Sequence, residues 1–255
     1  MCFDHDSRPP IAPIAGGSLD AQEIVLEGTD GNRFSAYIAR AAEPSGAGMV
    51  VLPDVRGLHA YYRDLALRLA EHGVDTIGID YFGRTAGIGD RGPGFDWAQH
   101  VPQTTYEGLR ADVTAAAGHL RTTTGASRIF TMGFCMGGRL AFLTDGFELG
   151  LAGVIGFYGW PVGPSRNGMP APAEVAGTFE APVLAIFGGA DEGIDADAVA
   201  TFEHALAEAG VKHRVVTYPG APHSFFDRKH EEFAETSAAA WDEVLAFIGA
   251  SAGTA

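Results

Sequence analysis

Cysteine is scarce in this chain of 255 residues, which contains only Cys2 and Cys135. Two cysteines so far apart do not form the framework of several disulfides that holds small secreted proteins together. No apolar run reaches the length of a transmembrane helix, and the N-terminal stretch MCFDHDSRPPIAPIAGG has no apolar signal core. We therefore predict a cytoplasmic protein without membrane contact, in which Cys135 is packed or reactive rather than cross-linked.

Positively charged side chains are also few. The chain has 17 lysine and arginine residues against 32 aspartate and glutamate residues, which gives a net charge of −15. Binding to nucleic acid depends on many contacts between cationic side chains and phosphates, so this balance argues against a nucleic-acid partner. An acidic surface also repels an anionic substrate at long range unless a basic group stands at the site itself.

The composition is otherwise that of an ordinary globular protein, with 46% hydrophobic and 19% charged residues. A chain of this length can bury a large core. We find no internal repeat and no linker that would divide it. The sequence predicts an N-terminal leader over residues 1–22 and a single domain over residues 23–250.

Alternating strands and helices are predicted along this domain. Residues 23–39 form two alternating runs around Asp30-Gly31, which is typical of a β-hairpin. Buried strands are expected at 47–54, 74–83, 127–133, 151–159, 181–191 and 212–220. Helices are expected at 61–73, 105–125, after Cys135, at 195–210 and near the C-terminus. The pattern predicts an α/β fold, with a mostly parallel sheet covered by helices on both faces.

The motif GFCMGG, residues 133–138, lies where one buried strand is followed by a helix. Its G-x-C-x-G pattern matches the nucleophile elbow of hydrolases, with sulfur in place of a hydroxyl. In such a turn the flanking glycines leave room, and the following helix favours a thiolate at its N-terminus. The ordinary alternative is a packed cysteine beside a glycine turn.

Two other strand ends favour the catalytic interpretation. Asp191 follows the strand at 181–191, and His223 follows the strand at 212–220. Active sites of open α/β sheets lie at the carboxyl ends of the strands, and Cys, Asp, His is the chain order of an α/β-hydrolase triad. Asp191 alone could be a helix N-cap and His223 alone a turn residue. Together with Cys135 they predict a nucleophile, a carboxylate and a base.

Metal ligands are not indicated. The other eight histidines show no metal-binding spacing, and the sequence has no HExxH motif. We expect neither a metal nor a cofactor.

The segments VVLPDVRGL, GFCMGG and HSF together resemble the dienelactone hydrolase family of the α/β-hydrolase superfamily, to which carboxymethylenebutenolidases belong. The resemblance extends over most of the chain. It implies an eight-stranded sheet without a large cap domain and no cofactor. It also implies hydrolysis of an enol lactone or related ester through an acyl-enzyme on the cysteine.

The resemblance also assigns roles to residues of this sequence. It makes Cys135 the nucleophile, His223 the general acid and base, and Asp191 the carboxylate that orients the histidine. The backbone N–H groups of Val55 and Met136 would form the oxyanion hole. Asp54, in LPDVRG, stands where the family has a longer glutamate that pairs with the resting thiol.

Arginines anchor a substrate carboxylate in that family, one of them shortly after HSF. In this chain the corresponding stretch is HSFFDR, with Arg228 displaced by one residue. Arg84 in YFGRT and Arg91 in GDRGPG are further candidates from a loop that could overhang the strand ends. Each could equally be an ordinary surface charge.

Aromatic side chains are candidates for the pocket wall. Tyr158, with Trp97 and Trp160, could line a substrate pocket, although such residues are more often core.

Two alternatives remain open. The chain could be a general carboxylesterase or thioesterase that has little need for a substrate carboxylate, or a small-molecule-binding relative without turnover. The complete triad argues against the second. The expected partner is a small lactone or ester, and the protein is expected to be a monomer or a small homo-oligomer.

Overall fold

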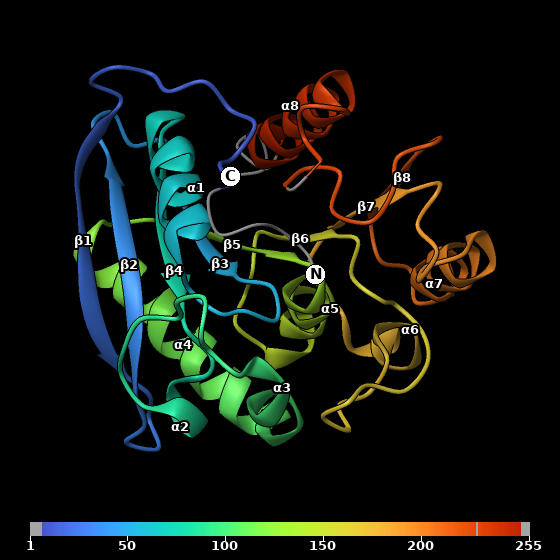
Figure 1. The fold of residues 1–255 in the computed structure, drawn as a ribbon, viewed down its shortest axis with the longest axis horizontal. Coiled ribbons are helices and arrows are strands. Elements are labelled where there is room, and N and C mark those ends of the chain that lie inside the picture. Colours follow the sequence, from blue (N-terminus) through green and yellow to red (C-terminus); the bar gives the residue numbers. More distant parts are fainter. Residues whose placement is uncertain (1–6, 228, 251–255) are drawn as a thin grey trace.

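The computed structural model describes residues 7–227 and 229–250, and its core is one eight-stranded sheet (Figure 1). The strand order is β1-β2-β4-β3-β5-β6-β7-β8. Strand β1 pairs antiparallel with β2 and β2 antiparallel with β4, while all other pairs are parallel. The strands are β1 (Ser18–Glu27), β2 (Arg33–Ala41), β3 (Ala47–Leu52), β4 (Val74–Ile79), β5 (Arg128–Phe134), β6 (Gly153–Phe157), β7 (Val183–Gly188) and β8 (His213–Tyr218).

Helices connect these strands and cover both faces of the sheet. They are α1 (Ala60–Glu71), α2 (Gly83–Ala86), α3 (Trp97–His100), α4 (Tyr106–Thr123), α5 (Met136–Leu143), α6 (Pro172–Val175), α7 (Ala196–Glu208) and α8 (Ala234–Ala250). The predicted α/β fold with a mostly parallel eight-stranded sheet is confirmed. The described residues contain no large cap domain over the strand ends.

The two faces carry different helices. α1 and α8 lie on one face, where Phe247 of α8 packs 6.3 Å from Phe130 of β5 between ring centroids. α4, α5 and α7 lie on the other, where Phe142 of α5 packs 4.9 Å from Phe202 of α7. Every residue of β3, β4, β6 and β7 is buried, as expected for strands covered on both sides.

Two boundaries differ from the sequence prediction. Strand β1 begins at Ser18, within the range predicted as a leader, and Ser18 and residues 20–22 pair with β2. The loop expected after β4 contains the short helices α2 and α3. Helices of four residues are stabilised by tertiary contacts and leave no periodic pattern in the sequence.

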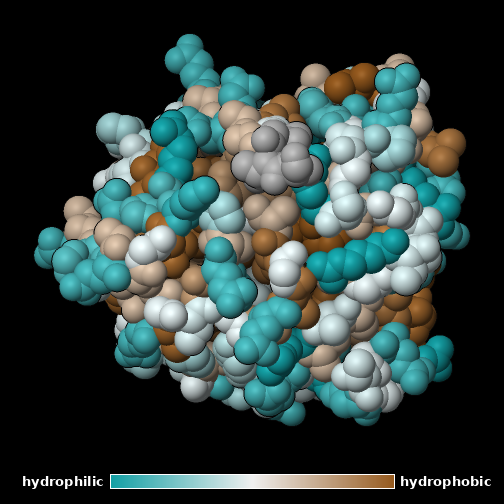
Figure 2. Space-filling view, turned by 180° about the vertical axis from the view of Figure 1, so that it is seen from behind, coloured by the Kyte–Doolittle hydropathy of each residue, from teal (hydrophilic) through white to brown (hydrophobic). Residues whose placement is uncertain are grey.

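Hydrophilic side chains are prominent on the molecular surface. Figure 2 shows hydrophilic side chains over most of the face seen from behind, with hydrophobic ones in small separate areas. Within residues 7–227 and 229–250, no helix combines the length and apolar character needed to cross a bilayer.

A buried carboxyl group in the turn after α5 makes the free energy of unfolding depend on pH. Asp145 accepts hydrogen bonds from the backbone N–H groups of Ala181 (2.9 Å) and Glu180 (3.2 Å), which ties the end of α5 to the start of β7. Burial raises the pKa of Asp145 from 3.8 to about 6, despite these two donors. The folded state therefore holds this proton more tightly than the unfolded state does, and the free energy of unfolding falls as pH rises from about 4 to 6.

We expect Asp145→Asn to flatten this pH dependence, because asparagine keeps an acceptor oxygen and cannot ionise. Between pH 4 and 6 the wild-type free energy of unfolding should fall by about 2 kcal/mol more than that of the variant, for a pKa raised from 3.8 to about 6 at 1.36 kcal/mol per pKa unit. Urea unfolding across pH 4–7 measures the difference. Asp242→Asn, at an exposed position on α8, is the matched control. Parallel curves for wild type and Asp145→Asn would contradict the prediction.

Candidate active site

Cys135 lies at the turn between β5 and α5, at the carboxyl edge of the sheet. Its φ of 56° is in the left-handed region, which non-glycine residues adopt rarely and mostly where the surrounding structure requires it. A Cβ atom on Gly133 would lie 1.9 Å from the carbonyl oxygen of Gly137, and one on Gly137 would lie 2.1 Å from that of Leu52. The turn therefore depends on both glycines of the motif.

Asp191 and His223 meet at the same edge of the sheet. Nδ1 of His223 lies 2.6 Å from Oδ2 of Asp191, and the other oxygen, Oδ1, accepts a hydrogen bond from the N–H of Gly193 at 2.9 Å. The Asp191 side chain is only 2% exposed, and the His223 side chain is 23% exposed. A proton on Nδ1 leaves Nε2 as the hydrogen-bond acceptor, which is the tautomer that a general base requires.

Two aromatic rings hold the imidazole in place. The rings of Tyr158 and Trp160 each lie 4.9 Å from the His223 ring between centroids. The indole N–H of Trp160 donates to the carbonyl oxygen of Gly193, in the loop that carries Asp191. These contacts fix the ring plane of His223 relative to Asp191.

Tyr158 was predicted to contact substrate, and the structure gives it a different position. It is completely buried, and its hydroxyl donates to Oδ2 of Asp227 at 3.0 Å. Burial, with the nearby Asp227 carboxylate, raises the pKa of Tyr158 well above its ordinary value, so it remains a neutral donor. Tyr158 thus packs against the His223 ring and does not line the cavity beside Cys135.

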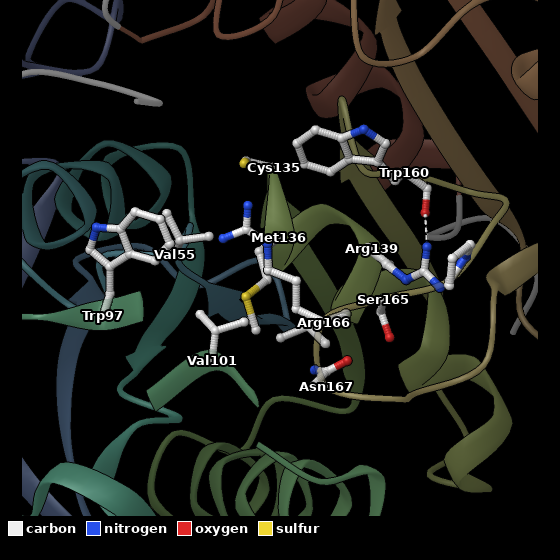
Figure 3. A pocket seen from close by; sticks show the side chains of 12 residues that line it. Val55, Trp97, Val101, Cys135, Met136, Arg139, Trp160, Ser165, Arg166 and Asn167 are labelled. Atoms are coloured by element: carbon white, nitrogen blue, oxygen red, sulfur yellow. Dashed lines mark hydrogen bonds between the residues drawn. The ribbon is translucent and has the colours of Figure 1, made fainter. Parts of the chain in front are cut away.

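A cavity of about 450 Å³ opens beside Cys135 (Figure 3). Val55 and Met136, the two residues predicted to supply oxyanion-hole N–H groups, line it together with the cysteine. Trp97 and Trp160 form part of its wall, which is otherwise largely apolar. The remaining lining residues are Val101, Arg139, Leu140, Pro164, Ser165, Arg166 and Asn167.

The predicted substrate arginines have other partners. Arg84 donates to Asp112 at 2.8 Å and also pairs with Asp30. Arg91 is 5% exposed and its Nη2 lies 2.6 Å from Oδ2 of Asp80. Neither arginine lines the cavity. Arg228 lies outside the described residues.

Asp54 precedes Val55 directly and is completely buried. Its Oδ1 accepts a hydrogen bond from the N–H of Arg56 at 2.8 Å, and its own N–H donates to the hydroxyl of Tyr62 at 2.9 Å. These bonds fix the segment that carries Val55. Its role toward the thiol stays a prediction.

Sequence reasoning missed two arginines that line the cavity, Arg139 and Arg166. Arg139 directly follows the GFCMGG motif, and its position there was a signal that could have been used. Arg166 lies in the Pro- and Gly-rich segment 161–180, which has no periodicity to indicate where its side chains point.

Comparison with known proteins gives a consistent family assignment. The model of the dienelactone hydrolase family matches residues 34–251. A Salmonella typhimurium protein named "Putative carboxymethylenebutenolidase" is 31% identical over 267 residues, covering 96% of both chains. The carboxymethylenebutenolidase of Rhodococcus opacus is 30% identical over 247 residues, covering 95% of this chain and 92% of that protein.

A solved structure shares the fold. The crystal structure titled "Putative Dienelactone Hydrolase from Klebsiella pneumoniae" superimposes with a TM-score of 0.78 at 27% identity. The similarity covers 91% of this chain and 99% of that one.

Proposed function

The chain belongs to the dienelactone hydrolase family, and we propose that it hydrolyses a small lactone or ester through an acyl-enzyme on Cys135. The observation that carries the proposal is the pairing of His223 with Asp191 at 2.6 Å, at the sheet edge where the elbow presents Cys135. The names of the relatives support a lactone or a related ester as the substrate class.

The first half of the reaction forms a thioester. Nε2 of His223 takes the thiol proton of Cys135, the sulfur attacks the substrate carbonyl carbon, and a C–S bond forms as the carbonyl oxygen becomes an oxyanion. When this intermediate collapses, the ester C–O bond breaks and the leaving oxygen receives a proton from His223. Asp191 stabilises the imidazolium that exists between these events.

The second half returns the enzyme to its starting state. Nε2 of His223 takes a proton from a water molecule, which attacks the thioester carbonyl. The tetrahedral intermediate then collapses, the C–S bond breaks, the sulfur takes the proton back from His223, and the carboxylic acid leaves. In a lactone the alcohol and the acid belong to one molecule, so the product is a single ring-opened hydroxy or oxo acid.

Backbone N–H groups would stabilise the oxyanion in both halves. Met136 is the first residue of α5, whose N–H has no acceptor within the helix. Val55 lines the same cavity from the loop after β3. Two fixed donors and the positive end of the α5 dipole act where negative charge develops, which is the most effective place for them.

A panel of small lactones, esters and thioesters tests the proposal, combined with rapid acid quenching, proteolysis and mass measurement of the peptides. We expect turnover of at least one lactone or ester, with a mass increase equal to the acyl group on the peptide containing Cys135. Turnover with no acyl group on Cys135 would overturn the covalent route, and a protein inactive on the whole panel would overturn the function.

The largely apolar and aromatic cavity wall favours a second candidate of the same chemistry. A general carboxylesterase or thioesterase would use Trp97, Trp160 and Val101 to bind a neutral acyl group. It would hydrolyse neutral esters better than anionic lactones of the same size.

Asp54 is proposed to keep the resting thiol protonated. A carboxylate near a cysteine disfavours the thiolate, so Asp54→Asn should lower the pKa of Cys135 while keeping the oxygen that accepts from Arg56. At a pH below the pKa of Cys135, each unit by which this pKa falls makes the reaction with iodoacetamide about tenfold faster. The rate is followed on the Cys135 peptide, with Cys2 as the internal control. Unchanged or slower alkylation would show that Asp54 does not act on the thiol.

A further inference from the structure

Trp160, shortly after the end of β6, connects two members of the proposed triad. Its ring lies 4.9 Å from the His223 ring between centroids, with 35° between the two planes. Its indole N–H donates to the carbonyl oxygen of Gly193 at 2.9 Å, and the N–H of Gly193 donates to Oδ1 of Asp191, also at 2.9 Å. Trp160 therefore links the imidazole to the loop that carries Asp191.

Arg139 fixes the backbone of the segment that Trp160 begins, residues 160–170 between β6 and α6. Arg139 lies on α5, and its own N–H donates to the carbonyl oxygen of Cys135 at 3.1 Å. Its guanidinium donates to four backbone carbonyl oxygens of the segment: Nη1 to those of Trp160 (3.1 Å) and Val162 (3.3 Å), and Nη2 to those of Gly163 (2.9 Å) and Pro170 (3.1 Å). Figure 3 shows the first of these bonds as a dashed line. We call the four bonds together the Arg139 clamp.

The guanidinium of Arg139 is fully used by this segment. Arginine carries two N–H groups on each Nη nitrogen, so the four acceptors match four donors. Only 6% of Arg139 is exposed, and no carboxylate of the described residues forms an ion pair with it. Its charge is therefore compensated by the carbonyl dipoles of residues 160–170. Moving the segment away would leave a buried cation without partners, which is costly.

The backbone of α5 also touches the chain that leads to Trp160. A Cβ atom on Gly159 would lie 2.3 Å from the backbone nitrogen of Arg139, so no side chain fits between the two backbones. The N–H of Cys135 donates to the carbonyl oxygen of Phe157 at 3.0 Å. The elbow and the chain after β6 are thus held together up to Gly159, and the Arg139 clamp extends this connection to Trp160 and beyond.

We propose that Arg139 is a positioning residue, which acts through Trp160 to place His223 for proton transfer. The inference rests on the proposed function. In both halves of the reaction the imidazole must come within hydrogen-bond distance of its partner, about 2.6–3.2 Å. A misplacement of about 1 Å can lower the rate by about 10²-fold, even when its cause lies far from the reacting atoms. The Arg139 clamp joins the helix that follows Cys135 to the ring that packs on His223, so it sets this distance.

A double-mutant cycle of Arg139 and Trp160 is the first test, with kcat and KM measured on a small neutral ester. We expect Arg139→Met and Trp160→Ala each to lower kcat by about 10- to 100-fold while KM changes less than about threefold, because the geometry of the chemical step is lost rather than binding. The double variant should be within about threefold of the slower single variant, since both changes break the same connection. Losses that multiply would show that Arg139 acts independently of Trp160, and would overturn the inference.

Arg139→Lys makes the test specific for the clamp. Lysine keeps the charge but offers three donors for four carbonyl oxygens, so its kcat should lie between those of Arg139→Met and wild type. A wild-type kcat would show that the charge alone suffices, and would overturn the clamp. Circular dichroism and thermal unfolding check the fold. If Arg139→Met does not fold, because it leaves four carbonyl groups unpaired, the cycle is run with Arg139→Lys.

Arg121→Met is the matched control. Arg121 also lies on a helix and donates to a backbone carbonyl oxygen, that of Leu149 at 2.7 Å, but it is exposed at the end of α4 and does not line the cavity. Its kcat and KM should equal those of wild type. A fall in kcat as large as that of Arg139→Met would overturn the specific role of Arg139.

Alkylation of Cys135 by iodoacetamide separates positioning from a direct effect of the charge on the sulfur. The thiolate is the reactive form, and His223 is the base that takes the thiol proton in the proposed mechanism. Arg139→Met should therefore slow alkylation by about 3- to 10-fold in the wild-type background and leave it unchanged in a His223→Gln background. Equal slowing in both backgrounds would show that the guanidinium acts on the sulfur directly, and would overturn positioning through His223.

The outcomes distinguish this inference from the proposed function. Losses in kcat that multiply, or slower alkylation that persists without His223, overturn the role of Arg139 while the hydrolase stands. A wild-type protein that hydrolyses no lactone or ester overturns the function, and the inference with it.

Discussion

Replacing Cys135 with alanine is expected to abolish hydrolysis, with a loss of at least about 10⁴-fold in kcat/KM, because the bond-forming atom is removed. The variant should fold, since alanine is smaller than cysteine and the turn depends on Gly133 and Gly137 rather than on sulfur. Circular dichroism and thermal unfolding check the fold, and the rate on the best lactone or ester of the panel checks the activity.

Two further variants make this result specific. Cys135→Gly relieves the positive φ of 56° and should also be inactive, which excludes backbone strain as the cause. Cys2→Ala should keep full activity. Cys135→Ser is expected to be poor rather than equal to wild type, because a hydroxyl depends more on the base than a thiol does. Full activity in Cys135→Ala would end the proposal of a cysteine nucleophile.

Replacing Asp191 with asparagine is expected to lower kcat by about 10³- to 10⁴-fold, as in serine-protease triads. Asp191 uses one oxygen for the N–H of Gly193 and the other for Nδ1 of His223. Asparagine has a single oxygen. If that oxygen keeps the Gly193 bond, the amide N–H₂ faces Nδ1 and moves the imidazole proton to Nε2, the atom that must accept a proton from substrate or water.

Asp195→Asn is the matched control for this variant. Asp195 lies four residues further on and caps α7, where its Oδ1 accepts from the N–H of Ala198 at 2.8 Å. Asparagine is an equally good N-cap, so activity and stability should change little. An Asp191→Asn enzyme within a few-fold of wild type, measured at saturating substrate, would remove Asp191 from the triad.

The strands and long helices could be predicted because their patterns depend on burial alone. Strands β3 and β7 are continuous apolar runs, and α8 places Trp241, Val244 and Ile248 in the core on one face. The elbow was recognisable for a similar reason. Its glycines are required by contacts within a few residues of Cys135 and with the neighbouring strand end, so they leave a short motif in the sequence.

Which arginines line the cavity could not be predicted in this way. Arg84 follows β4 closely, but its partners Asp30 and Asp112 are 54 and 28 residues away in the chain. No local pattern shows that these carboxylates already satisfy its charge. Arg166 follows no strand directly, and it lines the cavity from the segment 160–170, which Arg139 of α5 holds through hydrogen bonds to backbone carbonyl oxygens.

The clamp made by Arg139 has a consequence for how substrate range can diverge within this architecture. Its guanidinium donates to the main-chain oxygens of Trp160, Val162, Gly163 and Pro170, so this anchoring does not depend on the side chain at position 166. Ser165, in contrast, donates to the carbonyl oxygen of Met169 and holds the segment itself. Position 166 can therefore be exchanged while these bonds remain, and evolution and protein engineering alike can alter the cavity lining there without rebuilding the catalytic apparatus.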